Sequence, residues 1–185
     1  MLKNEVRLIG GQWKRSKLPV TDRPGLRPTP DRVRETLFNW LQPHVAGSRC
    51  LDLFAGSGAL GIEALSRGAA QVVFVDRETR VAAQLRNSLA MLGAMNAEVA
   101  QAEALQFLRT TAHTFDIVFL DPPFASGLRA EACRALAQQQ RLAPGALVYI
   151  EQPARSKLED LPTGWEILRT KRAGEVGYHL LRSPT

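Results

Sequence analysis

The segment Asp121-Pro122-Pro123-Phe124 has the residue types of a catalytic site that holds an aromatic ring carrying an amino group. Such an amine is a poor nucleophile because its lone pair is delocalised, so an enzyme must hold that lone pair toward the electrophile. The Asp121 carboxylate and a prolyl carbonyl, for which Pro122 is the candidate, can accept the two amine hydrogens. Phe124 can stack on a base drawn out of its helix. Taken alone, the segment is equally typical of a strand-ending turn with a buried phenylalanine.

A second candidate site is the glycine-rich turn in LDLFAGSGALG, residues 51–61. Its glycines let the backbone approach a ligand closely at the end of an apolar strand and the start of a helix. Asp76 and Arg77 end the next apolar segment, where an acid can accept hydrogen bonds from both ribose hydroxyls of a nucleoside cofactor. The cofactor-binding candidates in the turn itself are Asp52, Phe54, Ala55, Gly56, Ser57 and Gly58.

The position of Asp52 indicates which nucleoside cofactor is bound. A carboxylate just before the glycine turn would repel the pyrophosphate of NAD and attract the cationic amino-acid end of S-adenosylmethionine, which we therefore expect as cofactor. A turn used only for packing would explain the glycines but not Asp52 and Asp76. Glu103, followed by Ala104, is placed to accept a hydrogen bond from the adenine amine. It is nearly as typical of an exposed helix-start carboxylate.

An alternation of strands and helices must position these residues. Such alternation predicts a largely parallel sheet covered on both faces, with the ligand sites at the carboxyl ends of its strands. A closing β-hairpin is predicted over residues 165–171 and 177–182. The predicted strands are 49–54, 71–76, 97–101, 115–120 and 146–151, and the predicted helices are 59–67, 79–92, 104–110 and 128–140.

The N-terminal part of the chain predicts a β-hairpin and then a helix. The hairpin would pair residues 5–9 with 12–20 around Gly10-Gly11, with Trp13 either anchoring it or stacking on a base. Thr29 is the expected N-cap of the helix, with Pro30 at its first position and Pro43 at its end.

Positive charge gathers in this part of the chain. Residues 1–35 hold nine basic and four acidic residues, which accounts for +5 of the net charge of +6. Such concentration is expected of a surface that contacts a phosphate backbone, although a solvated basic face is the alternative. The RNA-binding candidates are Lys14, Arg15, Lys17, Arg27, Arg32 and Arg34.

Length and composition favour one compact enzyme. A chain of 185 residues that is 45% hydrophobic suits a single domain, 1–185, in which residues 1–43 form a basic hairpin-helix extension for RNA docking. No stretch resembles a membrane span or a signal peptide, so we expect a cytoplasmic protein. Cys50 and Cys133 fall in apolar segments with no Cys/His cluster, which predicts reduced core cysteines and no metal site.

Four motifs together resemble one family. LDLFAGSGALGIEAL, VVFVDR, DIVFLDPPF, and GLRPTPDRVRETLFNWL after a GGQW hairpin are similar to the RsmD-type 16S ribosomal RNA guanine-N2 methyltransferases, over nearly the whole chain. The resemblance implies an α/β, class I (Rossmann-like) methyltransferase fold. This fold has a mostly parallel seven-stranded sheet with a C-terminal antiparallel hairpin, plus an N-terminal β-hairpin and helix. It implies transfer of a methyl group to N2 of one guanosine of small-subunit RNA.

By the same resemblance, residues 27–35 lie against the cofactor and substrate mouth, where Thr29 or Arg32 could reach the methionine carboxylate of the cofactor. The family's usual RPTTDRVRE is RPTPDRVRE here, so Pro30 replaces a second threonine. The partner implied is 16S ribosomal RNA, for which the small reading surface favours a preassembled small-subunit particle, and we expect a monomer.

Other functions remain open to the sequence. A DNA adenine-N6 methyltransferase would also present its target amine to a DPP-aromatic motif, but it would ordinarily need a target-reading domain. A protein glutamine methyltransferase would be expected to have Asn in place of Asp121 and less positive charge. A non-catalytic RNA-binding protein would explain the basic N-terminal part but not the acids Asp52, Asp76 and Asp121.

Overall fold

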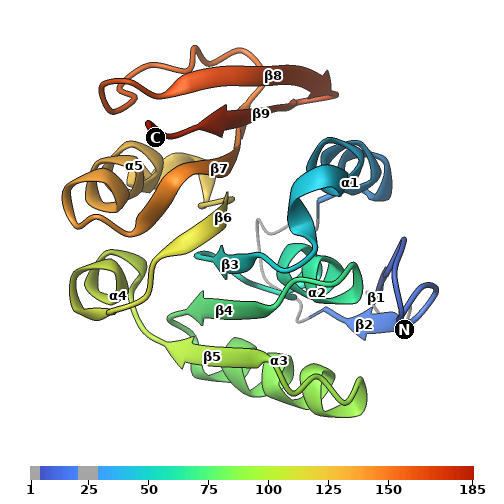
Figure 1. Cartoon of the computed structure of the whole chain (residues 1–185). Helices are drawn as coiled ribbons and strands as arrows, with labels where there is room; N and C mark the ends of the chain where they lie inside the picture. The colour runs from blue at the N-terminus through green and yellow to red at the C-terminus, as the bar shows by residue number, and fades with distance from the viewer. Residues whose placement is uncertain (1–4, 21–28) are drawn as a thin grey trace.

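The computed structural model describes residues 5–20 and 29–185, and its centre is a seven-stranded sheet (Figure 1). The strand order is β5-β4-β3-β6-β7-β9-β8. The first five strands in this order are parallel, and the last two form an antiparallel hairpin at one edge. This confirms the predicted fold class. The strands are β3 (Arg49–Asp52), β4 (Gln71–Asp76), β5 (Ala97–Gln101), β6 (Phe115–Leu120), β7 (Leu142–Pro153), β8 (Glu166–Ala173) and β9 (Val176–Arg182).

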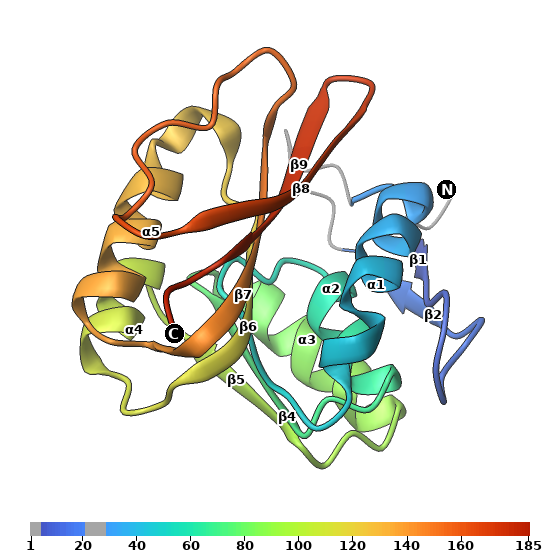
Figure 2. The same cartoon turned by 45° about the horizontal axis from the view of Figure 1, so that its top comes forward.

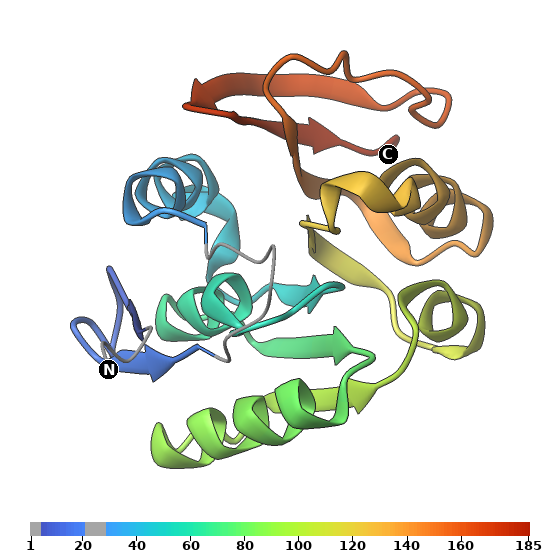
Figure 3. The same cartoon turned by 180° about the vertical axis from the view of Figure 1, so that it is seen from behind.

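Helices cover both faces of the sheet, as parallel strands buried on both sides require. Three helices pack on one face: α1 (Asp31–Val45), α2 (Ala59–Ser66) and α3 (Thr79–Met91). The other face carries α4 (Ala104–Thr110) and α5 (Leu128–Gln138), which the view from behind in Figure 3 also shows. Each face has its own apolar core. No helix in residues 5–20 and 29–185 has the length and hydropathy needed to cross a membrane.

Most element boundaries follow the sequence pattern, and the exceptions have local causes. The first parallel strand ends at Asp52 instead of residue 54, because the glycine turn already begins there. The strand predicted over residues 146–151 begins earlier, at Leu142, so that Pro144-Gly145 lies inside β7. The pairing of β6 with β7 shifts register in this stretch, and such a bulge accommodates a proline within a strand.

The N-terminal hairpin forms a separate two-stranded sheet of β1 (Glu5–Arg7) and β2 (Lys17–Pro19). It lies on the same side of the main sheet as α1 and α2 (Figure 2). The prediction of a tight turn at Gly10-Gly11 was wrong, because residues 8–16 form a long loop. Gly11 has φ +75°, and a Cβ there would lie 1.8 Å from the backbone oxygen of Ser66. These glycines therefore serve close packing on α2.

Helix α1 begins and ends differently from the prediction. Its N-cap is Pro30, without a side-chain hydrogen bond, so Thr29 is not the cap. Pro43 lies inside the helix, which continues to Val45. Pro43 has no N–H to bond the carbonyl of residue 39, and the helix continues for only two residues beyond it. Trp13 packs against the core cluster under this helix, which supports its role as an anchor of the hairpin loop.

Candidate active site

Four acidic side chains meet where the central parallel strands end. Asp52 closes β3, Asp76 closes β4, Asp121 follows β6 directly, and Glu151 lies near the end of β7. Because these strands are neighbours and parallel, their carboxyl ends open on one edge of the sheet, the usual place for ligands in such folds. Three of these acids were singled out from sequence, and Glu151 was not.

The glycine turn is held in place by Asp76. Asp76 Oδ2 accepts a hydrogen bond from the Gly56 N–H at 3.1 Å, and its Oδ1 accepts one from the Glu78 N–H at 2.9 Å. Gly58 has φ +75°, and a Cβ there would lie 2.4 Å from Leu85 Cδ1. The turn thus needs glycine at residue 58 for both backbone and space, and it brings backbone close to the ligand edge.

Asp52 is a buried acid without a cation beside it. Its side chain is almost enclosed, at 3% exposure, and its Oδ2 accepts the Gly61 N–H at 3.0 Å. The pKa of Asp52 is raised to about 7, chiefly by burial, with a smaller rise from the charge of Asp76 and an opposing effect of the Gly61 hydrogen bond. Within residues 5–20 and 29–185, Asp52 takes part in no ion pair. A cationic ligand group would stabilise its charged form, which fits the ammonium of S-adenosylmethionine.

The remaining cofactor candidates lie around the same turn. Arg77 and Glu103 are both exposed and form an ion pair at 3.7 Å across the ends of β4 and β5. Glu103 precedes α4, so its roles as adenine acceptor and as helix-start carboxylate both remain predictions. The other candidates lie in or beside these turns, buried or partly buried: Phe54, Ala55, Ser57 and Ala104.

Asp121 and Phe124 have the properties expected of a target site. Burial raises the pKa of Asp121 well above its ordinary value, and Glu151 and then Asp52 add to the rise through their negative charge. Phe124 is 48% exposed, so the interpretation of this segment as a turn around a buried phenylalanine was wrong. Pro122 is buried and Pro123 exposed. The residues Pro122, Pro123, Phe124, Glu151 and Gln152 line a cavity of about 330 Å³.

Glu151 is fixed by two hydroxyl groups. Thr29 Oγ1 donates a hydrogen bond to Glu151 Oε1 at 2.9 Å, and the Tyr149 hydroxyl donates to the same oxygen at 2.8 Å. The acid is 4% exposed, and burial raises its pKa while the two hydroxyls lower it. The signal that could have found Glu151 is the one that marked Asp76, an acid at the tip of a central strand.

Two predicted roles do not fit these positions. Thr29 was one of two residues, with Arg32, that could reach the methionine carboxylate, but its hydroxyl binds Glu151, whose negative charge would repel that group. Arg34 was expected on an RNA surface but is fully buried. It donates to Asp31 and to the Arg7 carbonyl, and it lies 3.8 Å from Glu63. Arg34 is therefore a structural residue that joins the hairpin, α1 and α2.

The other basic candidates are exposed where the structure describes them. Lys14 and Arg15 lie on the hairpin loop, Lys17 pairs with Glu5 at 2.9 Å, and Arg32 lies in the first turn of α1. Arg27 lies outside the described residues. No partner in the structure tests their predicted contact with RNA, which stays a prediction.

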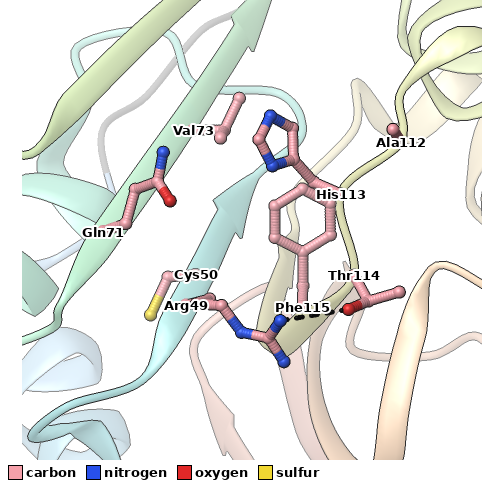
Figure 4. A pocket seen from close by; sticks show the side chains of 8 residues that line it. All are labelled: Arg49, Cys50, Gln71, Val73, Ala112, His113, Thr114 and Phe115. Carbon is pink, nitrogen blue, oxygen red and sulfur yellow. Dashed lines mark hydrogen bonds between the residues drawn. The ribbon is translucent and has the colours of Figure 1, made fainter.

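A further pocket lies at the opposite ends of the strands (Figure 4). Arg49 is the cationic residue of its wall, and its guanidinium is already engaged by Asp116 at 3.0 Å and Thr114 at 3.2 Å. Cys50, also in the wall, has its pKa raised to about 12, chiefly by burial. Such a thiol is a poor nucleophile. Cys133 is likewise buried and free, and no trio of metal-ligating side chains occurs in the part of the chain that the structure describes.

Comparison with known proteins gives a consistent result. A family model described as "Conserved hypothetical protein 95" matches residues 6–182. The chain is 49% identical over 176 residues to "Ribosomal RNA small subunit methyltransferase D" of Escherichia coli (strain K12), covering 95% of this chain and 89% of the relative. The protein of the same name from Haemophilus influenzae is 46% identical, covering 98% and 95%. A solved structure, "Putative methyltransferase yhhF from Escherichia coli", superposes with a TM-score of 0.92 at 45% identity, covering 98% and 99%.

Proposed function

Because the chain belongs to the ribosomal RNA small subunit methyltransferase D family, we propose that it methylates small-subunit ribosomal RNA with S-adenosylmethionine as cofactor. The target we propose is the exocyclic N2 amine of one guanosine in 16S RNA. The observation that carries the proposal is the meeting of a nucleoside-type glycine turn with Asp121 and the exposed Phe124 at one sheet edge.

The cofactor site consists of the groups around the glycine turn. In this proposal Asp52 binds the cofactor's ammonium, Asp76 its ribose hydroxyls, and Glu103 its adenine amine. The cofactor supplies an electrophilic methyl group on a sulfonium. Gly56 and Gly58 both have positive φ, and the tight turn that this allows would bring their backbone against the cofactor.

The target site acts mainly by positioning. Phe124 stacks on the extruded base, while Asp121 and the Pro122 carbonyl accept the two amine hydrogens, which turns the nitrogen lone pair toward the methyl group. The positive charge that develops on nitrogen is stabilised by the Asp121 carboxylate. After transfer the nitrogen carries a positive charge and must lose one proton. The Asp121 carboxylate, whose pKa is raised, can accept that proton.

The N-terminal part supplies the RNA contact in the same proposal. Lys14, Arg15, Lys17 and Arg32 are exposed basic residues outside the core sheet, and Arg27 is assigned to the same surface on sequence alone. Residues 1–43 would then be a docking extension of one methyltransferase domain that acts as a monomer on a small-subunit particle in the cytoplasm. Clustered positive charge of this kind binds phosphates with little sequence preference, so the particle's shape must select the site.

Methyl transfer to RNA from cells that lack this enzyme tests the function. The protein, labelled cofactor, and either small-subunit particles or extracted RNA are incubated, and the labelled nucleoside is identified after digestion. The expected product is N2-methylguanosine at one position, with the particle as the better substrate. Label in N6-methyladenosine or in DNA would show the alternative enzyme class, and cofactor binding without any transfer would leave only an RNA-binding role.

A further inference from the structure

We propose that Glu151 selects guanine, by accepting a hydrogen bond from N1–H of the base whose N2 amine lies against Asp121. The inference rests on the proposed function above and deepens it by assigning the choice of base to one side chain. Neither the sequence pattern nor the glycine and DPPF motifs assign Glu151 a role.

The first support is position. The register of β6 and β7 pairs Leu120 with Ile150, so Asp121, just past the end of β6, lies level with Glu151, which is still inside β7. The negative charge of Glu151 is a cause of the raised pKa of Asp121, as two neighbouring acids require. Glu151 also lines the cavity that contains Phe124. A base stacked on Phe124 therefore has two carboxylates within the same site.

The second support is orientation. Both hydroxyl donors, from Thr29 and Tyr149, bind Oε1 of Glu151. Oε2 accepts no hydrogen bond from any side chain or backbone group of residues 5–20 and 29–185. Oε2 is not one of the buried atoms that lack a partner, so part of its surface stays open, and no basic side chain among these residues forms an ion pair with Glu151. The geometry thus leaves Oε2 for an N–H donor that arrives with a ligand.

The third support is the chemistry of the two candidate bases. In guanine the N2 amine has N1–H beside it, so this edge offers neighbouring donors. In adenine the N6 amine has an unprotonated N1 beside it, which is an acceptor and would face the lone pairs of the carboxylate. A site built to bind a hydrogen-bonding group rejects an analogue that lacks it strongly, because a buried polar group is left unpaired. Two acceptors side by side therefore favour guanine.

The competing explanation is structural. Glu151 joins Thr29, from the segment before α1, to Tyr149 in the central sheet, and it could serve only to hold that segment. The two roles differ in one respect. A structural residue changes the rate for every substrate alike, whereas a selecting residue changes the ratio between substrates that differ at N1.

The test compares guanosine with 2-aminopurine at the mapped target position of a synthetic RNA. 2-Aminopurine keeps the amine at C2 but has no hydrogen on N1. The wild-type protein should prefer guanosine by roughly 10²–10⁴ in kcat/KM. In Glu151→Gln the side-chain oxygen can still accept from Thr29 and Tyr149, and the amide NH₂ then faces the cavity. This variant should lose most of the preference, so that the two substrates come within about tenfold of each other.

Matched variants complete the experiment. Glu166→Gln makes the same charge change at an exposed site on β8. It should leave the ratio of kcat/KM for guanosine to kcat/KM for 2-aminopurine unchanged. Tyr149→Phe and Thr29→Val each remove one hydroxyl from Oε1 and should lower the ratio partly, which tests the proposal even if Glu151→Gln folds poorly.

The outcomes separate this proposal from the proposed function. The role of Glu151 would be overturned if Glu151→Gln lowered kcat/KM equally for both substrates. It would also be overturned if the wild-type protein showed no preference for guanosine over 2-aminopurine. In either case methylation of guanosine by the wild type would leave the proposed function standing. If the wild type placed no methyl group on guanosine at all, the proposed function itself would fail.

Discussion

Asp52 accepts the backbone N–H of Gly61 at 3.0 Å while lying almost wholly out of solvent. One neutral hydrogen bond offsets only part of the cost of burying a carboxylate, which is why the pKa of Asp52 rises to about 7. Asp52 thus links the end of β3 to α2 across the glycine turn. A cationic ligand group beside it would stabilise its charged form.

Cofactor binding should release a proton. Near pH 6.5 a large share of Asp52 is protonated, and an ammonium placed beside it lowers its pKa, so the proton leaves on binding. Titration calorimetry in two buffers of different ionisation enthalpy should show a release that approaches one proton per site below pH 7. Asp52→Asn should remove the buffer dependence and weaken binding by about 1–3 kcal/mol. Equal heats in both buffers for the wild type would contradict the assignment.

The same acid should make the free protein less stable as pH rises. Below the unfolded pKa of 3.8 both states are protonated and Asp52 has no effect. Between 3.8 and about 7 only the folded state keeps the proton, so stability falls with pH, and above about 7 the loss is complete. Asp52→Asn should therefore raise the free energy of unfolding at pH 8, by up to about 4 kcal/mol, and change it little at pH 4. Denaturant unfolding at the two pH values measures this difference, and a gain that is equal at both would exclude titration as its cause.

Asp121 should act on the chemical step and Phe124 on capture of the base. Asp121→Ala should lower the single-turnover rate at saturating RNA by roughly 10²–10³, with cofactor affinity nearly unchanged. Phe124→Ala should instead raise the Michaelis constant for RNA, because it removes the stacking surface. If Asp121→Ala reacted at the wild-type rate under these conditions, residues 121–124 would be a structural turn only.

The hairpin loop should set the salt dependence of RNA binding. Lys14→Gln combined with Arg15→Gln should weaken binding and reduce the slope of log K against log salt by about 0.7–0.9 for each phosphate that is no longer neutralised. Lys17 is left intact because Glu5 already neutralises part of its charge. Arg109→Gln with Arg134→Gln, on the α4 and α5 layer, is the matched control. An unchanged slope for the first pair would make this loop an ordinary solvated surface.

Gly11 should be needed for the hairpin to dock. Gly11→Ala adds a Cβ that would overlap the Ser66 backbone oxygen, in addition to the strain of φ +75°. Gly47 has the same φ with no atom within 4 Å, so Gly47→Ala measures the strain alone, about 1–2 kcal/mol. Gly11→Ala should lower the free energy of unfolding clearly more than Gly47→Ala does, as measured by thermal unfolding. It should also weaken RNA binding, while cofactor affinity stays close to that of the wild type. Equal costs for the two variants would show that the packing against Ser66 yields easily.

The sequence predicts the parallel core well because its signals are local. The strands at 71–76, 97–101 and 115–120 have the predicted bounds, since each is an apolar or alternating run with polar or glycine-containing ends. The acids Asp52, Asp76 and Asp121 follow from the same pattern, because the end of a buried strand fixes where the next residue lies.

The N-terminal part could not be predicted equally well because distant residues decide it. Gly10 looks like a hairpin turn residue, yet its N–H binds Glu63 at 2.7 Å, 53 positions away. Thr29 looks like a helix cap, yet its hydroxyl binds Glu151, 122 positions away. Arg34 is of a residue type usually found on surfaces, yet it is buried beside two acids. Such distant partners cannot be predicted from the local propensity of a residue, and only the folded structure shows them.

The docking of the hairpin on α2 sets an order of events during synthesis. The Glu63 carboxylate accepts hydrogen bonds from the backbone N–H groups of Ile9 and Gly10. The Ser66 hydroxyl accepts one from the Trp13 N–H. A growing chain therefore contains its basic loop some fifty residues before the helix that fixes this loop has been made. Until then the loop lacks these contacts, so it can take its folded position only when α2 and the parallel core form.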